Sequence, residues 1–312
     1  MEENKTFNTI ESLNTLANDT YLQLLKDNKL QEILKAMGKF PDYAIVNDVL
    51  VLAQMPEATK VLSKEEWEFK GRQLVESPKY INKISHCLYK LEQGNIDSRG
   101  TMYVVGTDKL TVKLSTVYDI SQTTGQEFPE QIDIELLSKH FDIVKKSLEH
   151  TSKSYKFEYA EIEKTSIVDT TNKIITIKKG LTLREIITEL LDRVSVVLLD
   201  NRKQEGITIN NKSNIKDIEY LAAQYAIHSR YGLELPTADF KEISKFKQED
   251  MMLFKDNLQK IRSVVYQITK NLENSIDFAL RGLDKQKDKQ QESKETKNAS
   301  KNKQKQAENE VF

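Results

Sequence analysis

The residues that could bind a metal or act as a nucleophile are few and scattered in this sequence. It contains four histidines, His86, His140, His150 and His228, and a single cysteine, Cys87. Two imidazoles share a Zn²⁺ when they stand at positions i and i+4 on one helix face, and no two of these histidines have that spacing. The cysteine has no obvious neighbouring base to activate its thiol. The sequence therefore predicts neither a zinc centre nor a catalytic cysteine.

Cations and aromatic residues are interleaved between residues 60 and 90. A site for single-stranded DNA needs a cationic groove and aromatic faces on which bases can stack. The segment contains Lys60, Lys64, Lys70, Arg72, Lys79, Lys83 and Lys90, together with Trp67, Phe69, Tyr80 and Tyr89. Its charge is diluted by Glu65, Glu66, Glu68 and Glu76. Two interpretations stay open: a DNA-binding surface, or a solvated helix face with Trp67 in the core.

The individual polar residues of this region also have two interpretations. Arg72 is the better candidate for phosphate contact, because its guanidinium can fork onto phosphate oxygens. Asn47 and Gln54 could bind sugar or base edges, or they could make capping or buried hydrogen bonds within the fold.

Composition limits the classes of protein that fit. A chain of 312 residues can form two domains, and a net charge of −1 gives no global field for nucleic acid, so any binding must come from a local patch. One cysteine excludes an internal disulfide and suits a reducing compartment. The N-terminal residues do not resemble a secretion signal, and no apolar run approaches the roughly 20 residues of a membrane span. We therefore expect a cytoplasmic protein that does not contact a membrane.

Hydrophobic periodicity predicts the elements that carry these residues. Helical spacing covers about 10–37, 43–54, 133–150, 181–200, 214–230 and 249–280. Alternation over 102–120 predicts two or three antiparallel strands, and shorter strands are expected at 155–161 and 173–178. Residues 284–312 are rich in lysine, glutamine, asparagine and glutamate with almost nothing apolar, which predicts a disordered tail.

A longer stretch resembles a known family. NDVLVLAQMPEATKVLSKEEWEFKGRQLV, from Asn47, and VYDISQTTGQEFP, from Val117, resemble two motifs of the ArdC-like antirestriction proteins and related LtrC-like proteins of conjugative elements. We call the matching residues the signature: Asn47, Gln54, Pro56, Ala58, Thr59, Trp67, Gly71 and Arg72 in the first motif, and Ser121, Gln122, Thr123 and Gly125 in the second. In all, the resemblance spans roughly residues 10–280.

The resemblance implies that the first domain binds single-stranded DNA, because that is the role of this domain in the family. The residues that it points to, with the neighbouring lysines, are Asn47, Gln54, Thr59, Trp67, Lys70, Arg72, Lys79 and Lys83. One segment departs from the family pattern. Where the family has a glycine-containing basic turn, this chain has Ser77, Pro78, Lys79 and Tyr80, which alters the backbone expected to face a phosphate.

The second half resembles the metallopeptidase domain of the same family, but its metal ligands are replaced. At the positions of the family's H-E-x-x-H motif this chain has Asp192, Arg193 and Val196, and Asp217 and Glu219 lie near the position of the third ligand. An alignment shifted along the helix, to Arg184, Glu185 and Thr188, also contains no histidine. Without the paired imidazoles and the glutamate base, we expect no metal, no cofactor and no peptidase activity.

Together these observations predict an α+β protein. It would consist of N-terminal helices with a small antiparallel sheet (10–130, DNA-binding), a mostly helical zincin-like domain with a short sheet (131–283), and the tail (284–312). The expected function is sequence-nonspecific binding of single-stranded DNA in a plasmid, conjugative element or phage, in antirestriction or conjugation. The alternative is an adaptor that does not bind DNA and holds a protein partner in the inactive peptidase cleft and at the final helix. An active hydrolase with unconventional ligands is the third hypothesis.

Overall fold

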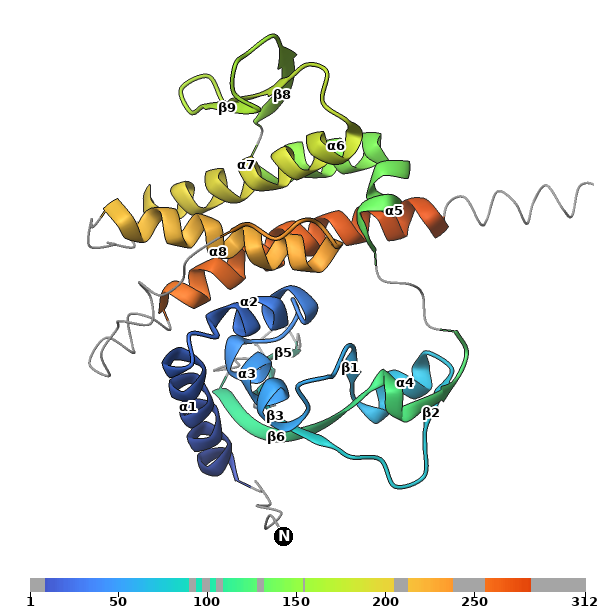
Figure 1. Ribbon diagram of the computed structural model, residues 1–312. Helices are drawn as coiled ribbons and strands as arrows, with labels where there is room; N and C mark the ends of the chain where they lie inside the picture. The colour runs from blue at the N-terminus through green and yellow to red at the C-terminus, as the bar shows by residue number, and fades with distance from the viewer. Residues whose placement is uncertain are drawn as a thin grey trace, which may run out of the picture. The chain divides into compact units, whose positions relative to one another are not determined.

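The computed structural model describes residues 9–89, 94–96, 102–104, 109–127, 132–153, 155–204, 213–237 and 256–281 (Figure 1). The predicted tail, 284–312, lies outside these residues. The described residues form two compact units. The first unit lies within Met1–Gln131 and Leu199–Tyr266, and the second lies within Ile132–Leu198 and Gln267–Phe312.

Three helices open the first unit: α1 (Ile10–Lys26), α2 (Leu30–Lys39) and α3 (Ile45–Gln54). A capping box between Thr9 and Ser12 starts α1, because the Thr9 hydroxyl satisfies a backbone amide that has no partner within the helix. The single helix expected over 10–37 is divided, because Asn28 adopts a left-handed conformation with φ of 53°. Asparagine tolerates this conformation better than most residues.

A three-stranded antiparallel sheet completes the core of the first unit. Its order is β1 (Val61–Leu62), β6 (Lys109–Asp119) and β3 (Ile81–Tyr89). Buried residues of α2, of α3, of this sheet and of the segments that follow the two helices form one cluster. It contains Ala36, Phe40, Val51, Met55, Ala58, Val61, Ile81 and Val117. The alternating pattern over 102–120 thus corresponds to β6 and to a short β5 (Met102–Val104), which pairs with β4 (Gly94–Ile96).

The remaining elements of the first unit are short, except for α8. They are α4 (Lys64–Phe69), β2 (Arg72–Leu74), the 3₁₀ helix η1 (Ile120–Gln122), β7 (Thr123–Gly125) and α8 (Ser213–Tyr231). Helix α8 packs on α2, and their backbones approach closely at Gly38: a Cβ placed there would lie 2.2 Å from the carbonyl oxygen of Ala226. The missing side chain at position 38 therefore makes this helix crossing possible.

The second unit is mostly helical with a small mixed sheet. It contains α5 (Ile134–Lys139), α6 (Phe141–Thr151), most of α7 (Leu183–Gln204) and the later part of a helix over residues 256–281. The sheet order is β8 (Lys156–Ala160), β10 (Ile174–Lys178) and β9 (Ser166–Asp169), with β10 parallel to β8 and antiparallel to β9. The predicted α+β class is confirmed. Within the described residues, no helix is both long and apolar enough to cross a membrane.

The carboxyl group of Asp48 lies in the core of the first unit. Asp48 on α3 is 0% exposed, and neither of its carboxylate oxygens has a hydrogen-bond partner among the described residues. Burial raises the pKa of Asp48 well above its usual value, an effect that the positive charge of Arg262 only partly opposes. Tyr21 is also buried, and this burial raises the pKa of its hydroxyl group, with the charge of ionised Asp48 as a second cause. Asp48 is therefore most stable here in its neutral form.

This burial predicts the sign of a pH effect on stability. Above about pH 4 the unfolded chain releases the Asp48 proton, while the folded chain retains it. The free energy of unfolding should therefore fall as pH rises, until pH reaches the raised pKa of the folded state. For each pH unit by which the folded-state pKa of Asp48 exceeds its unfolded-state value, the free energy of unfolding should be lower by about 1.4 kcal/mol once the pH is above both values.

Asp48→Asn should remove this pH dependence, because an amide cannot titrate, and should raise stability at pH 7.5. Urea denaturation at pH 4.5, 6 and 7.5 measures both effects, with Asp19→Asn on the exposed face of α1 as the control. A slope against pH that is equal in Asp48→Asn and in the unsubstituted chain would contradict the prediction.

Candidate nucleic-acid interface

Helix α4 divides the aromatic residues of the signature region into a buried and an exposed one. Ser63 and Glu66 form a capping box at its start. Trp67 is 0% exposed, and its indole Nε1 donates to the carbonyl oxygen of Tyr118 at 2.9 Å. Phe69, two residues later, is 92% exposed. Positions two apart on a helix point roughly 200° apart, so if Trp67 anchors the helix, Phe69 must face solvent.

Arg72 holds the strand pair that follows α4. Its Nε donates to Thr123 Oγ1 at 2.7 Å, one terminal nitrogen donates to the Thr123 carbonyl oxygen at 3.0 Å, and the other contacts the Gln126 carbonyl oxygen. The three bonds close the ladder in which β2 pairs with β7. The guanidinium predicted to bind phosphate is therefore occupied by backbone and hydroxyl acceptors of the protein itself.

The glycines of the signature permit the same strand pair. Gly71 and Gly125 have φ values of 71° and 133°, in the region that favours glycine. A Cβ at Gly125 would lie 2.4 Å from the Gly71 carbonyl oxygen. The G-R and T-x-G motifs thus belong to one structural feature, a close backbone approach at the end of α4.

Asn47 and Gln54 bind the outer edge of β3, although each was a candidate for contact with sugar or base. The Asn47 side chain donates to the Ile84 carbonyl oxygen at 2.8 Å and accepts from the Ile84 amide at 2.9 Å. Gln54 makes the equivalent pair with Asn82, at 2.9 and 3.0 Å. Each amide therefore replaces a residue of a neighbouring strand, and together they satisfy an edge that β6 does not cover.

A third backbone contact fixes the segment that leads into β1. One Asp119 carboxylate oxygen accepts from the amides of Thr59 and Lys60 at 2.7 and 3.0 Å, and the other accepts from the Ser121 amide at 3.0 Å. Burial alone would raise the pKa of Asp119, but the hydrogen bonds from Ser121, Lys60 and Thr59 together lower it. Thr59, another predicted contact residue, is exposed and takes part through its backbone amide.

The exposed candidates lie at the two ends of the segment that joins α4 to β3. Lys70 follows Phe69 directly and is exposed, while Lys79 and Tyr80 precede β3, with Tyr80 50% exposed. Nearby acids are partly occupied, since Glu66 caps α4 and Glu68 lies 3.8 Å from Lys64. A cation beside an exposed ring at each end of the segment is the arrangement that single-strand binding requires.

Lys83 has a different environment from the other predicted lysines. Its Nζ lies 4.4 Å from the centroid of the Tyr43 ring, a cation–π distance. Burial lowers the pKa of Lys83, and Glu66 opposes this effect. Its amino group is thus partly engaged inside the first unit.

The departure from the family's glycine turn has a clear structural counterpart. Ser77 adopts φ of 56°, a left-handed conformation that glycine enters without strain. The turn between β2 and β3 therefore keeps a glycine-like backbone at Ser77 although a side chain is present.

The replaced metal positions in the second half form no metal cluster. Asp192, Arg193 and Val196 are half-buried on α7, and Arg193 Nε lies 3.7 Å from Glu189 Oε2. Glu219 on α8 is buried, whereas the side chain of Asp217 lies outside the described part of the structure. Within that part, no group of three histidine, cysteine or acidic side chains could hold a metal ion.

Comparison with known proteins finds similar crystal structures, and two of them are of the antirestriction ArdC protein from R388 plasmid. The metal-free structure has 10% sequence identity and a TM-score of 0.40, and the match covers 74% of this chain and 84% of that chain. The Mn(II)-bound structure has 12% identity and a TM-score of 0.38, with 75% and 83% covered. No family model and no curated protein matches the sequence.

The residue that sequence reasoning left out of the candidate set is Phe69. Its exposure could have been inferred from Trp67, because one helix of six residues cannot bury two aromatic side chains that point in opposite directions. The roles of Asn47, Gln54 and Arg72 could not be inferred in this way, because their partners lie far away in the sequence.

Proposed function

We propose that this protein binds single-stranded DNA without sequence preference, in antirestriction or conjugation of a mobile element. The observation that carries the proposal is Phe69, a ring 92% exposed at the end of a helix held by Trp67 and by the signature strand pair. An exposed apolar ring on such a fixed support is a stacking platform. Lys70 stands beside it, with Lys79 and Tyr80 at the other end of the same segment.

In this proposal most signature residues build the interface and do not contact DNA. Asn47, Gln54 and Arg72 bond to the protein backbone, so they fix the path of the exposed segment. The resemblance in sequence supports the proposal, because the family's corresponding domain binds single strands. Residues 131–283 are proposed to be an inactive metallopeptidase-like domain, because Arg193 stands where the family has its glutamate base.

The first test is a titration of labelled oligothymidine and of duplex DNA, followed by fluorescence anisotropy. We expect preferential binding of the single strand, with affinity that falls steeply with salt as condensed counterions are released. Phe69→Ala should weaken binding by about 1–3 kcal/mol, the usual value for one stacked base, and Lys70→Ala should reduce the dependence on salt.

The matched control is Phe278→Ala, which removes another largely exposed ring, 82% exposed, from the second unit. Arg72→Ala should lower the stability of the fold, because Arg72 bonds to Thr123, and it should not remove a direct contact with DNA. Equal affinity for single strands and duplex, or a Phe69→Ala variant that binds as tightly as the unsubstituted chain, would refute the proposal.

A further inference from the structure

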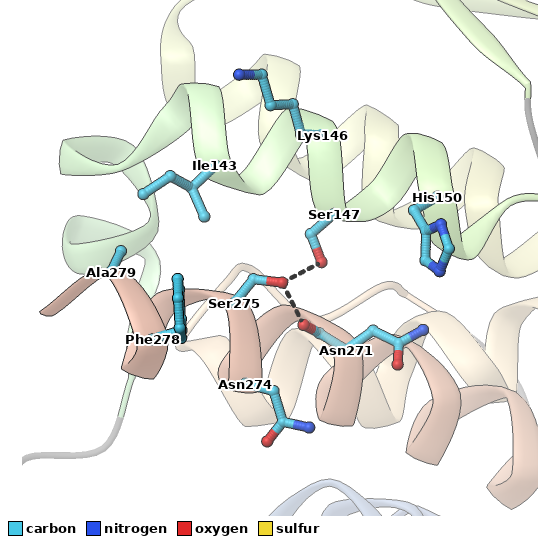
Figure 2. A pocket seen from close by; sticks show the side chains of 9 residues that line it. All are labelled: Ile143, Lys146, Ser147, His150, Asn271, Asn274, Ser275, Phe278 and Ala279. Atoms are coloured by element: carbon cyan, nitrogen blue, oxygen red, sulfur yellow. Dashed lines mark hydrogen bonds between the residues drawn. The ribbon is translucent and has the colours of Figure 1, made fainter. Parts of the chain in front are cut away.

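A groove with a volume of about 670 Å³ lies in the second unit, between α6 and the helix over 256–281. Its lining residues recur at helical spacing on both helices, and they are Ile143, Lys146, Ser147 and His150 from α6 and Asn271, Asn274, Ser275, Phe278 and Ala279 from the other helix. Figure 2 shows these two rows facing each other. The volume lies within the range of sites that hold a ligand or a short peptide segment.

Hydrogen bonds fix the floor of the groove, while its end is open. Ser275 Oγ donates to the Asn271 carbonyl oxygen at 2.7 Å and lies in a hydrogen bond with Ser147 Oγ at 3.1 Å (Figure 2). Asn271 Nδ2 donates to Thr151 Oγ1 at 3.1 Å. Phe278, at the end of the groove, is 82% exposed. A large exposed ring beside a pre-formed hollow is the usual form of an anchor site for another apolar side chain.

The charge of the groove is one-sided. Its lining contains no aspartate or glutamate, and its ionisable side chains are Lys146 and His150, one helical turn apart and both exposed. The Lys146 side chain extends away from the facing helix in Figure 2, so its amino group stands at the rim. A complementary occupant would therefore carry large apolar side chains and acidic groups close to them.

Residues 308–312 of this same chain have that chemistry. Glu308, Asn309, Glu310, Val311 and Phe312 combine two acids with two adjacent large apolar residues, in contrast to the lysine-rich 285–305. The segment is tethered to the helix that forms one wall, because residues 282–312 follow directly after Arg281, the last residue of that helix that the structure describes. At about 3.3 Å per residue, residues 282–307 are ample to bring it back to Phe278.

We propose that residues 308–312 dock in this groove, with Val311 and Phe312 against Phe278 and Ile143 and with Glu308 and Glu310 near Lys146 and His150. The amide groups of Asn271 and Asn274 can pair with the backbone of a bound extended segment. Tethering gives the segment an effective concentration on the order of millimolar, so that even a weak contact is occupied. This proposal concerns the second unit and is independent of DNA binding.

The experiment uses full chains and a fluorescent peptide of residues 303–312. A chain with Val311→Ser and Phe312→Ser has an open groove and should bind the peptide saturably. The unsubstituted chain should bind it at least about 10-fold more weakly, because its own segment competes. Phe278→Ala in the open-groove chain should weaken binding at least about 10-fold, and Lys146→Glu should weaken it less and only at low salt.

The matched control is Phe69→Ala in the open-groove chain, which should bind the peptide unchanged. Absent binding to the open-groove chain, or binding that Phe278→Ala leaves unchanged, would overturn the proposal. Equal binding to the unsubstituted chain would show that its own segment does not occupy the groove, and it would also overturn the proposal. A molecular mass that rises with the concentration of the unsubstituted chain, but not of the open-groove chain, would show that the segment docks into a second copy, and it would also overturn the proposal.

Discussion

Gly38→Ala should destabilise the first unit by about 3 kcal/mol or more, the upper end of the range for overpacked positions. The added Cβ would lie 2.2 Å from the Ala226 carbonyl oxygen and 3.2 Å from its carbonyl carbon, and both are backbone atoms of α8. A flexible side chain could rotate away, but here two helices must move apart. The sign is opposite to intrinsic propensity, by which alanine in a helix is favoured over glycine by about 1 kcal/mol.

Urea denaturation followed by far-ultraviolet circular dichroism measures the effect. The control is Gly232→Ala, the same change just after the end of α8. There, apart from the two chain neighbours, no atom of the described residues lies within 4 Å of the new Cβ, and only the left-handed φ of 65° is unfavourable. This control should cost about 1–2 kcal/mol. If Gly38→Ala proved neutral or stabilising, the close packing of α2 on α8 would be wrong.

Asn47→Ala should cost about 2–4 kcal/mol, because it removes both hydrogen bonds to Ile84 and leaves a buried amide and carbonyl unsatisfied. Gln54→Ala should cost less, since Gln54 is only half-buried and water can reach the Asn82 groups. Asn47→Asp keeps an acceptor for the Ile84 amide, but it loses the donor and buries a charge, so we expect it to be no better than alanine at neutral pH.

Hydrogen exchange separates this local effect from a general loss of stability. In Asn47→Ala the Ile84 amide should lose more protection than amides of β6 that face β3. Asn18→Ala, an exposed change on α1, serves as the control. Equal loss of protection throughout the sheet, or a cost below about 0.5 kcal/mol, would mean that Asn47 does not support this strand edge.

The cores of both units show which features of the fold follow from the local sequence. Leu13, Ala17 and Tyr21 on α1, and Leu190, Val194 and Val197 on α7, are buried at helical spacing, because each helix must turn one face towards the core whatever covers it. The α+β class, the position of most helices and the buried Trp67 follow from this local rule. The opposite exposure of Phe69 follows from it too.

Tertiary structure decided what the polar signature residues do. Asn47 reaches Ile84 and Arg72 reaches Thr123, and both pairs are distant in sequence. An amide or a guanidinium binds a strand edge as readily as a DNA strand, so residue type alone does not choose between them. The grouping of Leu199–Tyr266 with the N-terminal elements was decided in the same way, because α8 can pack on α2 only where Gly38 leaves room. Periodicity shows that a face is buried, but only the folded chain determines which partner covers it.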